Sequence, residues 1–241
     1  MKFTSRGPGH CASIGPATFS YVAILSGLLS MLLLGSCMNP AVLTTSQSVK
    51  DIPQLAYFPS LAYIQHIEKG NQAQFNDSLS SITAYKLDSL LGSHSSTYHL
   101  SESIWPADGF IKMKTEIEIN QLIQMVRAKR NLNAIPLPPT LDSLMEARDQ
   151  RYAMAVIGAG FGRVKGNFRG QLAKGVGIGI LTLGMYAPVP VKSNLSLFTL
   201  VIDAQENKVV YYRRSTPVEK SPTSTDVIHR ELTGLLNKTF Q

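Results

Sequence analysis

The stretch NLSLFTLVIDAQENKVVYYRR, residues 194–214, decides the fold that the sequence predicts. Two runs rich in β-branched, aromatic and aliphatic residues flank a short polar stretch, Ala204 to Asn207. Runs of this kind on either side of a few polar residues are typical of a β-hairpin. We therefore expect two antiparallel strands here, joined by a turn at 204–207.

Upstream lies AVIGAGFGRVKG, Ala155–Gly166, which begins like a dinucleotide-binding loop. Gly158 and Gly160 match the first two glycines of the G-x-G-x-x-G fingerprint, but Arg163 stands at the sixth position. The residues that follow lack the helical apolar period that would aim a helix N-terminus at a phosphate. The pattern favours a buried strand, apolar on both faces, that ends in a glycine-rich loop or bulge, and it predicts no cofactor.

Helix signals surround these strands. Asn76 and Asp77 are candidate N-caps for a helix whose leucines and isoleucine continue to Leu91. A second helix is expected from about Lys114 to Arg130, ahead of the proline-rich NAIPLPPT. Thr140 is a candidate cap for a short helix, Leu141 to Asp149, and Thr225 for the last helix.

Two further segments read as extended. QLAYFPSLAYIQHIE (54–68) is rich in aromatic and aliphatic residues and is broken at Pro59. STYHLSESIW (96–105) alternates and ends at a turn signature, Pro106 to Gly109. The expected order is therefore strand, helix, strand, helix, strand, strand, strand, helix. This order predicts one α/β domain over 54–241 with a single mixed sheet, interrupted by a glycine-rich apolar insert at 163–192.

The N-terminus indicates where the chain is located. Lys2 and Arg6 precede an apolar run of 16 residues, Phe19 to Leu34. This run is shorter than the ~20 residues of a membrane-spanning helix and is typical of a signal peptide core. Then follows Leu34-Gly35-Ser36-Cys37, which resembles the lipobox of bacterial lipoproteins.

That resemblance implies cleavage before Cys37, a diacylglycerol on its thiol and a further acyl chain such as palmitate on its new amino group. Residues 1–36 are then a lipoprotein signal peptide, and 37–53 a lipidated N-terminus and flexible tether. Two or more acyl chains hold a protein stably at a membrane, so the protein is expected in the bacterial cell envelope, at the outer membrane facing the periplasm. An ordinary secretory signal with a chance cysteine is the alternative.

Charge and cysteine content set further limits. Removal of Lys2 and Arg6 with the signal lowers the net charge from +7 to +5, and the remaining basic residues are scattered, which argues against nucleic acid as a partner. Cys11 leaves with the signal and Cys37 carries lipid, so no thiol remains for a disulfide, a zinc site or a nucleophile.

The element order also resembles the α/β domain of envelope lipoproteins such as the curli-secretion lipoprotein and the lipoprotein activators of penicillin-binding proteins. The strand that ends in D-A-x-x-x-K-V-V and runs into an aromatic residue carries the similarity: Asp203, Ala204, Lys208, Val209, Val210, Tyr211. The resemblance implies a protein that works in the envelope by binding or assembly. The sequence departs from this resemblance at the glycine-rich apolar insert, residues 163–192.

The insert contains GVGIGILTLGMYAPVPV, Gly175–Val191, 17 residues without a charge. Bulky residues alternate with glycines at its start, which places the bulk on one face of an extended strand. Such an element must be covered by its own domain, by a second copy or by lipid. We expect it to mediate self-association or membrane contact, with Ile178, Ile180 and Leu183 as its apolar anchors.

A search for catalytic residues finds no pattern. The histidines outside the signal, His66, His94, His99 and His229, lack metal-ligand spacing. The pair Glu116 and Glu118 and the serine pairs Ser80-Ser81 and Ser95-Ser96 match no catalytic motif. The sequence therefore predicts no catalytic, cofactor or metal site, and no enzyme.

Three hypotheses about function remain open. The favoured one is a membrane-anchored interaction or assembly factor of the envelope. The alternative is a periplasmic carrier or sensor that binds a small lipid or a cell-wall fragment. An envelope hydrolase is the third.

Overall fold

The structure, a computed structural model, describes residues 42–46, 48–68, 72–163 and 191–240. The chain divides into two units, Met1–Asn39 and Pro40–Gln241, and every described residue belongs to the second. Within the described residues, no helix is both long and apolar enough to cross a membrane.

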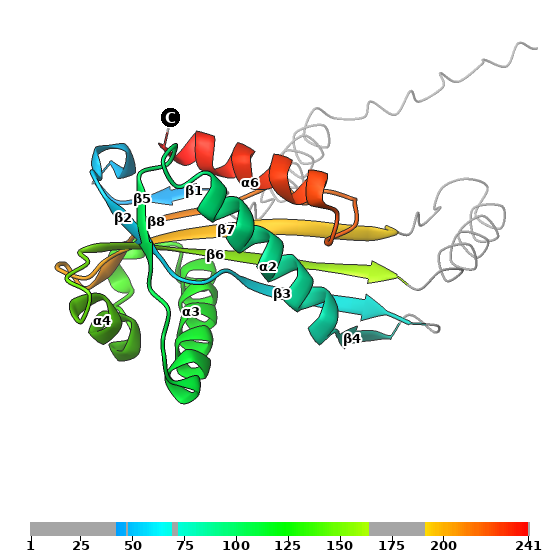
Figure 1. The fold of residues 1–241 in the computed structure, drawn as a ribbon, viewed down its shortest axis with the longest axis horizontal. Helices are drawn as coiled ribbons and strands as arrows, with labels where there is room; N and C mark the ends of the chain where they lie inside the picture. Colours follow the sequence, from blue (N-terminus) through cyan, green and yellow to red (C-terminus); the bar gives the residue numbers. More distant parts are fainter. Residues whose placement is uncertain (1–41, 47, 69–71, 164–190, 241) are drawn as a thin grey trace, which may run out of the picture. The chain divides into compact units, whose positions relative to one another are not determined.

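Eight strands form one mixed sheet around a long central strand, β6 (Tyr152–Arg163) (Figure 1). On one side β6 pairs antiparallel with β7 (Ser193–Asp203), and β7 pairs antiparallel with β8 (Lys208–Arg214). The edge strand β1 (Val42–Thr44) pairs antiparallel with β8. The predicted hairpin is confirmed, with its turn at 204–207.

On its other side β6 pairs with two short strands in succession, β2 (Leu55–Tyr57) and β3 (Leu61–Ile67), both parallel to it. This break at Pro59 was expected from the sequence. Strand β5 (Leu100–Ser103) pairs with the outer side of β2, and β4 (Ala73–Phe75) pairs with the outer side of β3. Neither outer strand spans the link between β2 and β3, so the sheet edge is open there.

The helices cover both faces of the sheet (Figure 1). Helices α2 (Asp77–Ser93) and α6 (Thr225–Phe240) pack on one face, while α3 (Gly109–Lys129) and α4 (Pro139–Glu146) pack on the other. Two short 3-10 turns, η1 (Val49–Asp51) and η2 (Leu132–Ala134), complete the described elements. The predicted fold class, an α/β domain with a single mixed sheet, is confirmed.

The side chains of β6 pack into a hydrophobic core on each face of the sheet. Met154 and Val156 belong to the core under α2 and α6, while Ala153, Ala155 and Ile157 belong to the core under α3 and α4. Alternate side chains of a strand point to opposite faces, so a strand buried on both sides reads as a continuous apolar run. The interpretation of this stretch as a buried strand is confirmed, but the predicted loop at its glycines is wrong, because the strand continues through Gly158 and Gly160 to Arg163.

The glycines of this strand are explained by its neighbours. Gly158 and Gly160 both lie inside β6 and not at the start of a helix. A Cβ on Gly160 would collide with the backbone carbonyl oxygen of Asn194 in β7. The resemblance to a nucleotide loop therefore comes from close packing of two strands.

The second helix begins earlier than predicted. Helix α3 starts at Gly109 and not near Lys114. The Asp108 carboxylate caps it, accepting from the backbone amides of Phe110 and Ile111 at 2.8 and 3.0 Å. The expected turn signature at Pro106 to Gly109 thus contains a helix N-cap, which aspartate also favours.

The short helix α4 begins at Pro139, so Thr140 lies inside its first turn and does not cap it. Instead, the amide and hydroxyl of Thr140 donate to the Glu118 carboxylate at 3.0 and 2.7 Å. The Leu141 amide donates to the same carboxylate at 3.2 Å. A buried acidic side chain from α3 therefore satisfies amides at the N-terminus of α4.

Two other expectations are corrected. In STYHLSESIW only Leu100–Ser103 pairs as a strand, because the residues before it form turns. Part of the expected tether at 37–53 belongs to the domain: Val42–Thr44 pairs with β8, and Val49 and Ile52 are buried in the core beside α6. The few apolar residues of this polar stretch show no periodicity, so neither the strand nor the burial could be predicted from the sequence.

Candidate binding groove

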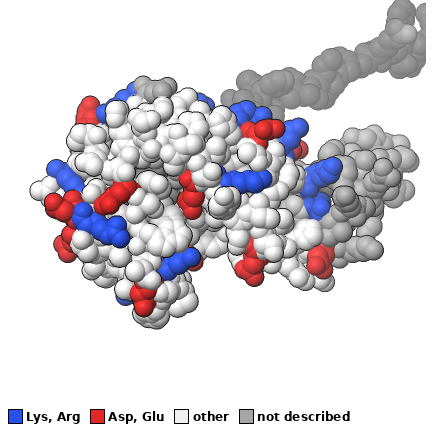
Figure 2. All heavy atoms as spheres, in the orientation of Figure 1, with Lys and Arg blue, Asp and Glu red and all other residues white. Residues whose placement is uncertain are grey.

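A groove of about 490 Å³ lies between α2 and α3, at the open part of the sheet edge. It is lined by the β2–β3 link and β3, by β4 and α2, and by the β5–α3 loop and the first half of α3. Its polar and charged lining residues are Ser60, Asp77, Ser80, Ser81, Asp88, Lys112, Thr115 and Glu116. Acidic, basic and uncharged side chains are interspersed on the face in Figure 2, and uncharged ones cover most of it.

Asp88 of α2 is held in the groove by a backbone hydrogen bond. Its carboxylate accepts the backbone amide of Ser60 at 2.6 Å. Burial raises the pKa of Asp88, while the bonds from Ser60 and the charge of Lys112 oppose the rise only in part. A carboxyl group whose charged form is disfavoured in a groove is typical of functional sites.

Ser60 adds a second unusual group. Its side chain is 4% exposed, and its Oγ has no hydrogen-bond partner of good geometry within the described residues, although it lies near enough to Asp88 to lower that carboxyl's pKa. Buried hydroxyl groups without partners are rare in folded proteins, because leaving one unsatisfied costs about 1–3 kcal/mol. Ser60 is therefore an unusual buried hydroxyl in the wall of the groove.

Aromatic side chains form the rim. Phe75, Tyr85 and Trp105 are 56%, 74% and 49% exposed, and all three line the groove. The Lys112 ammonium lies 5.0 Å from the centre of the Trp105 ring. Half-buried Tyr63 lies deeper, and burial followed by the charge of Glu116 raises its pKa.

The lining of the groove has the composition of a binding site. Flat aromatic rims with a few convergent polar groups are typical of such sites.

The site residues that the sequence predicts lie outside the described residues. They are the lipidation site Cys37 and the contact residues Ile178, Ile180 and Leu183. Those assignments stay predictions.

The structure separates some candidate residues and brings others together. Glu116 lines the groove, whereas Glu118 turns to α4, so the two do not form a carboxylate pair. The rings of His94 and His229 lie 5.5 Å apart between α2 and α6. Ser80 lines the groove, where its hydroxyl accepts the Ile64 amide at 3.0 Å. Within the described part of the chain, no three His, Cys, Asp or Glu side chains gather as metal ligands.

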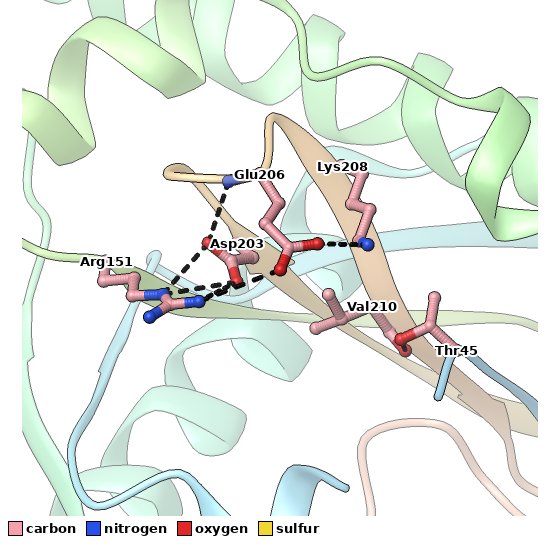
Figure 3. Close-up of polar contacts among 6 residues, drawn as sticks. All are labelled: Thr45, Arg151, Asp203, Glu206, Lys208 and Val210. Carbon is pink, nitrogen blue, oxygen red and sulfur yellow. Dashed lines mark hydrogen bonds and ion pairs between the residues drawn. The ribbon is translucent and has the colours of Figure 1, made fainter. Parts of the chain in front are cut away.

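A second charged cluster lies at the hairpin turn and is structural (Figure 3). Asp203 is fully buried and accepts from Arg151 Nη2 at 3.0 Å and from the Glu206 amide at 3.1 Å. The hydrogen bond to Asp203 raises the pKa of Arg151, and Glu206 also pairs with Lys208. These bonds fix the hairpin against the start of β6, which explains the aspartate and lysine of the D-A-x-x-x-K-V-V stretch.

The sequence did not predict the groove. Ser60, Asp88 and Lys112 are separated by more than twenty residues each, and none belongs to a motif. Helix α3 does carry a second apolar stripe, Phe110, Met113 and Ile117, beside its buried one, but these three residues do not line the groove. All three are exposed, at 67%, 52% and 47%.

No protein-family model matches the chain, and no curated protein matches it. Solved structures with a similar chain trace include a PelC dodecamer from Paraburkholderia phytofirmans and a point variant of it. The variant is 11% identical with a TM-score of 0.38, and the match covers 82% of this chain and 96% of that one. The other PelC structure is 10% identical with a TM-score of 0.36, over 82% and 93% of the two chains.

A DUF4136 family protein from Bacteroides thetaiotaomicron is also similar, at 10% identity and a TM-score of 0.28, over 83% of this chain and 91% of that one. At these identities and TM-scores, the similarities define neither a family nor a function for this chain.

Proposed function

We propose that the protein is a bacterial envelope lipoprotein, anchored through acylated Cys37, that acts as an interaction or assembly factor. In this proposal the partner binds at the α2–α3 groove and its surroundings. The anchor is most consistent with the outer membrane and a domain that faces the periplasm.

One observation carries the interaction proposal. Nine large apolar side chains of the described residues are exposed, and eight of them come from β4, α2, the β5–α3 loop and α3. These eight are Phe75, Ile82, Tyr85, Trp105, Phe110, Ile111, Met113 and Ile117. Three of them, Phe75, Tyr85 and Trp105, lie together at the groove. Scattered apolar residues on a surface need no explanation, but apolar residues that gather in one place mark a contact surface.

The composition of this surface fits a protein partner. Aromatic residues and methionine are enriched where proteins meet, and Trp and Tyr dominate the binding energy of such contacts. The groove supplies the polar groups that such a contact needs, in Asp88, Ser60 and Glu116.

The test is recovery of partners from envelope membranes with the lipidated protein. Wild type should retain a defined set of envelope proteins that the double variant Tyr85→Ala and Trp105→Ala loses. Truncation of two such anchors is expected to weaken binding by roughly 10- to 1,000-fold. Val42→Ala, the exposed apolar residue outside this region, serves as the control and should retain them. Identical recovery with both variants would contradict the proposal.

The groove volume favours a second candidate, the carrier or sensor of a small lipid or wall fragment. About 490 Å³ lies within the range of roughly 300–1,000 Å³ that is usual for small-ligand sites. Mass spectrometry of the gently purified protein distinguishes the two. A bound small amphiphile that Trp105→Ala releases would favour the carrier, and its absence together with recovered proteins would favour the interaction factor.

A further inference from the structure

The described fold begins very close to the proposed anchor. Strand β1 starts at Val42, five positions after Cys37. A fully extended chain spans at most ~3.6 Å per residue, so these five steps reach no further than about 18 Å. If Cys37 is acylated, as proposed above, the sheet edge at β1 is held near the lipid surface by covalent geometry alone.

Basic side chains surround this edge on both faces of the sheet. Arg213 lies opposite Val42, and its Nη1 donates to the backbone carbonyl of Lys238 at the end of α6 at 2.8 Å. On the other face, burial raises the pKa of Tyr212, and the nearby charges of Arg127 and Arg214 oppose that rise. Tyr212 lies opposite Leu43 in β1.

We call Arg127, Arg213, Arg214 and Lys238 the edge cluster. Arg127 and Lys238 are exposed, and Arg213 and Arg214 are half-buried. None of the four forms an ion pair with a described residue. By contrast, Arg148, Arg151, Lys208 and Arg230 all pair with acidic side chains elsewhere in the domain.

We propose that the edge cluster docks on anionic phospholipid headgroups beside the acyl anchor. Four uncompensated cations next to a short connection are positioned for such a surface. Charges on a protein act over about 8 Å at physiological ionic strength, so only cations that come close to the membrane contribute, and the short connection to Cys37 lets this edge come that close. The acyl chains then supply retention, and the edge cluster supplies the orientation of the domain.

The test uses the mature chain, residues 37–241, with Cys37→Ser, which removes the lipid and keeps every described element. It is mixed with vesicles of pure phosphatidylcholine or of phosphatidylcholine with 30% phosphatidylglycerol, and bound protein is measured by flotation. Binding is expected only to the anionic vesicles and should fall as salt rises. The triple variant Arg127→Gln, Arg214→Gln and Lys238→Gln should bind about 100-fold more weakly, from about fivefold for each charge removed near an anionic surface. Arg213 is left intact because its guanidinium bonds α6.

The matched control removes three charges elsewhere, with Lys114→Gln, Arg148→Gln and Arg230→Gln. Its loss of binding to the anionic vesicles should be less than a third of the loss in the edge-cluster variant. Equal losses in both triple variants would show that net charge alone matters, and equal binding to the two kinds of vesicle would show an apolar contact; either result overturns the proposal. Because the vesicle assay uses unlipidated protein, its outcome does not depend on whether Cys37 is acylated in cells.

Discussion

At the scale of single residues, Asp88 is the group whose environment opposes its charge. Its bond from the Ser60 amide fixes the carboxylate in place, yet burial outweighs that bond and raises the pKa. Activity often depends on groups that reduce stability, so a carboxyl group of this kind in a groove is a candidate functional group. Asp88 and Ser60 together are therefore the polar centre of the groove, and they make a clear prediction about stability.

Asp88→Asn should stabilise the protein at neutral pH. An aspartate whose pKa is raised by folding contributes stability while it is protonated, below its ordinary pKa, and that contribution is lost as the pH rises through the raised value. Asparagine stays neutral and its Oδ1 still accepts from Ser60. The advantage of the variant, measured by urea unfolding, should grow from about pH 4 to pH 7.

The control for this measurement is the wild-type protein, unfolded in parallel at each pH. A variant at position 88 that is less stable than wild type at pH 7 would contradict this account of the carboxyl group.

Gly160 tests the interpretation of the glycine-rich strand. Gly160→Ala should lower the free energy of unfolding by about 1–3 kcal/mol, because its Cβ meets the carbonyl oxygen of Asn194. For Gly162→Ala, two residues on in the same strand, the new Cβ meets no atom of a described residue within 4 Å, so the variant should be nearly neutral. Equal stability of the two variants would mean that β6 and β7 do not approach as described.

At the scale of elements, the sequence predicted those whose apolar period is strong. The hairpin, the central strand and the helix capped by Asn76 follow from local pattern, and the Asn76 side chain does accept from the Leu79 amide at 2.9 Å. Local pattern missed the start of α3, because Asp108 reads equally well as a turn residue and as a cap. It also missed β1, because three residues that pair with a distant strand carry no period of their own.

The packing of α3 on α4 is an element-scale prediction. Glu118 is 7% exposed and accepts three hydrogen bonds from the first turn of α4. Glu118→Ala leaves those donors unsatisfied, so urea unfolding should show a loss of about 1–3 kcal/mol. Glu116→Ala, two residues earlier and facing the groove, is the control and should change stability by less than about 0.5 kcal/mol.

At the scale of the whole molecule, the groove is a product of topology. Strands β2 and β3 follow one another along β6, and their outer partners leave the link between them uncovered. Helices from opposite faces of the sheet then border that opening. A sequence pattern reports periods along a single element, so it could not place Asp88 of α2 near Lys112 of α3.

The membrane anchor is the whole-molecule prediction that the sequence makes alone. Cys37→Ser should leave an uncleaved precursor and abolish labelling by a fatty-acid analogue in cells, because acylation of the thiol precedes cleavage in lipoproteins. The measurement is gel mobility of the cellular protein with and without the analogue. Normal processing of the variant would contradict the lipobox interpretation.

The most direct test of the central claim, that the groove is where this protein meets its partner, is site-specific cross-linking in cells. A photoreactive amino acid is placed at Tyr85 on the groove rim or, as the control, at exposed Glu146 on α4. The account predicts a discrete cross-linked envelope protein from position 85, lost when Trp105→Ala is added, and none from position 146. The same products from both positions, or a product from position 85 that Trp105→Ala leaves unchanged, would contradict it.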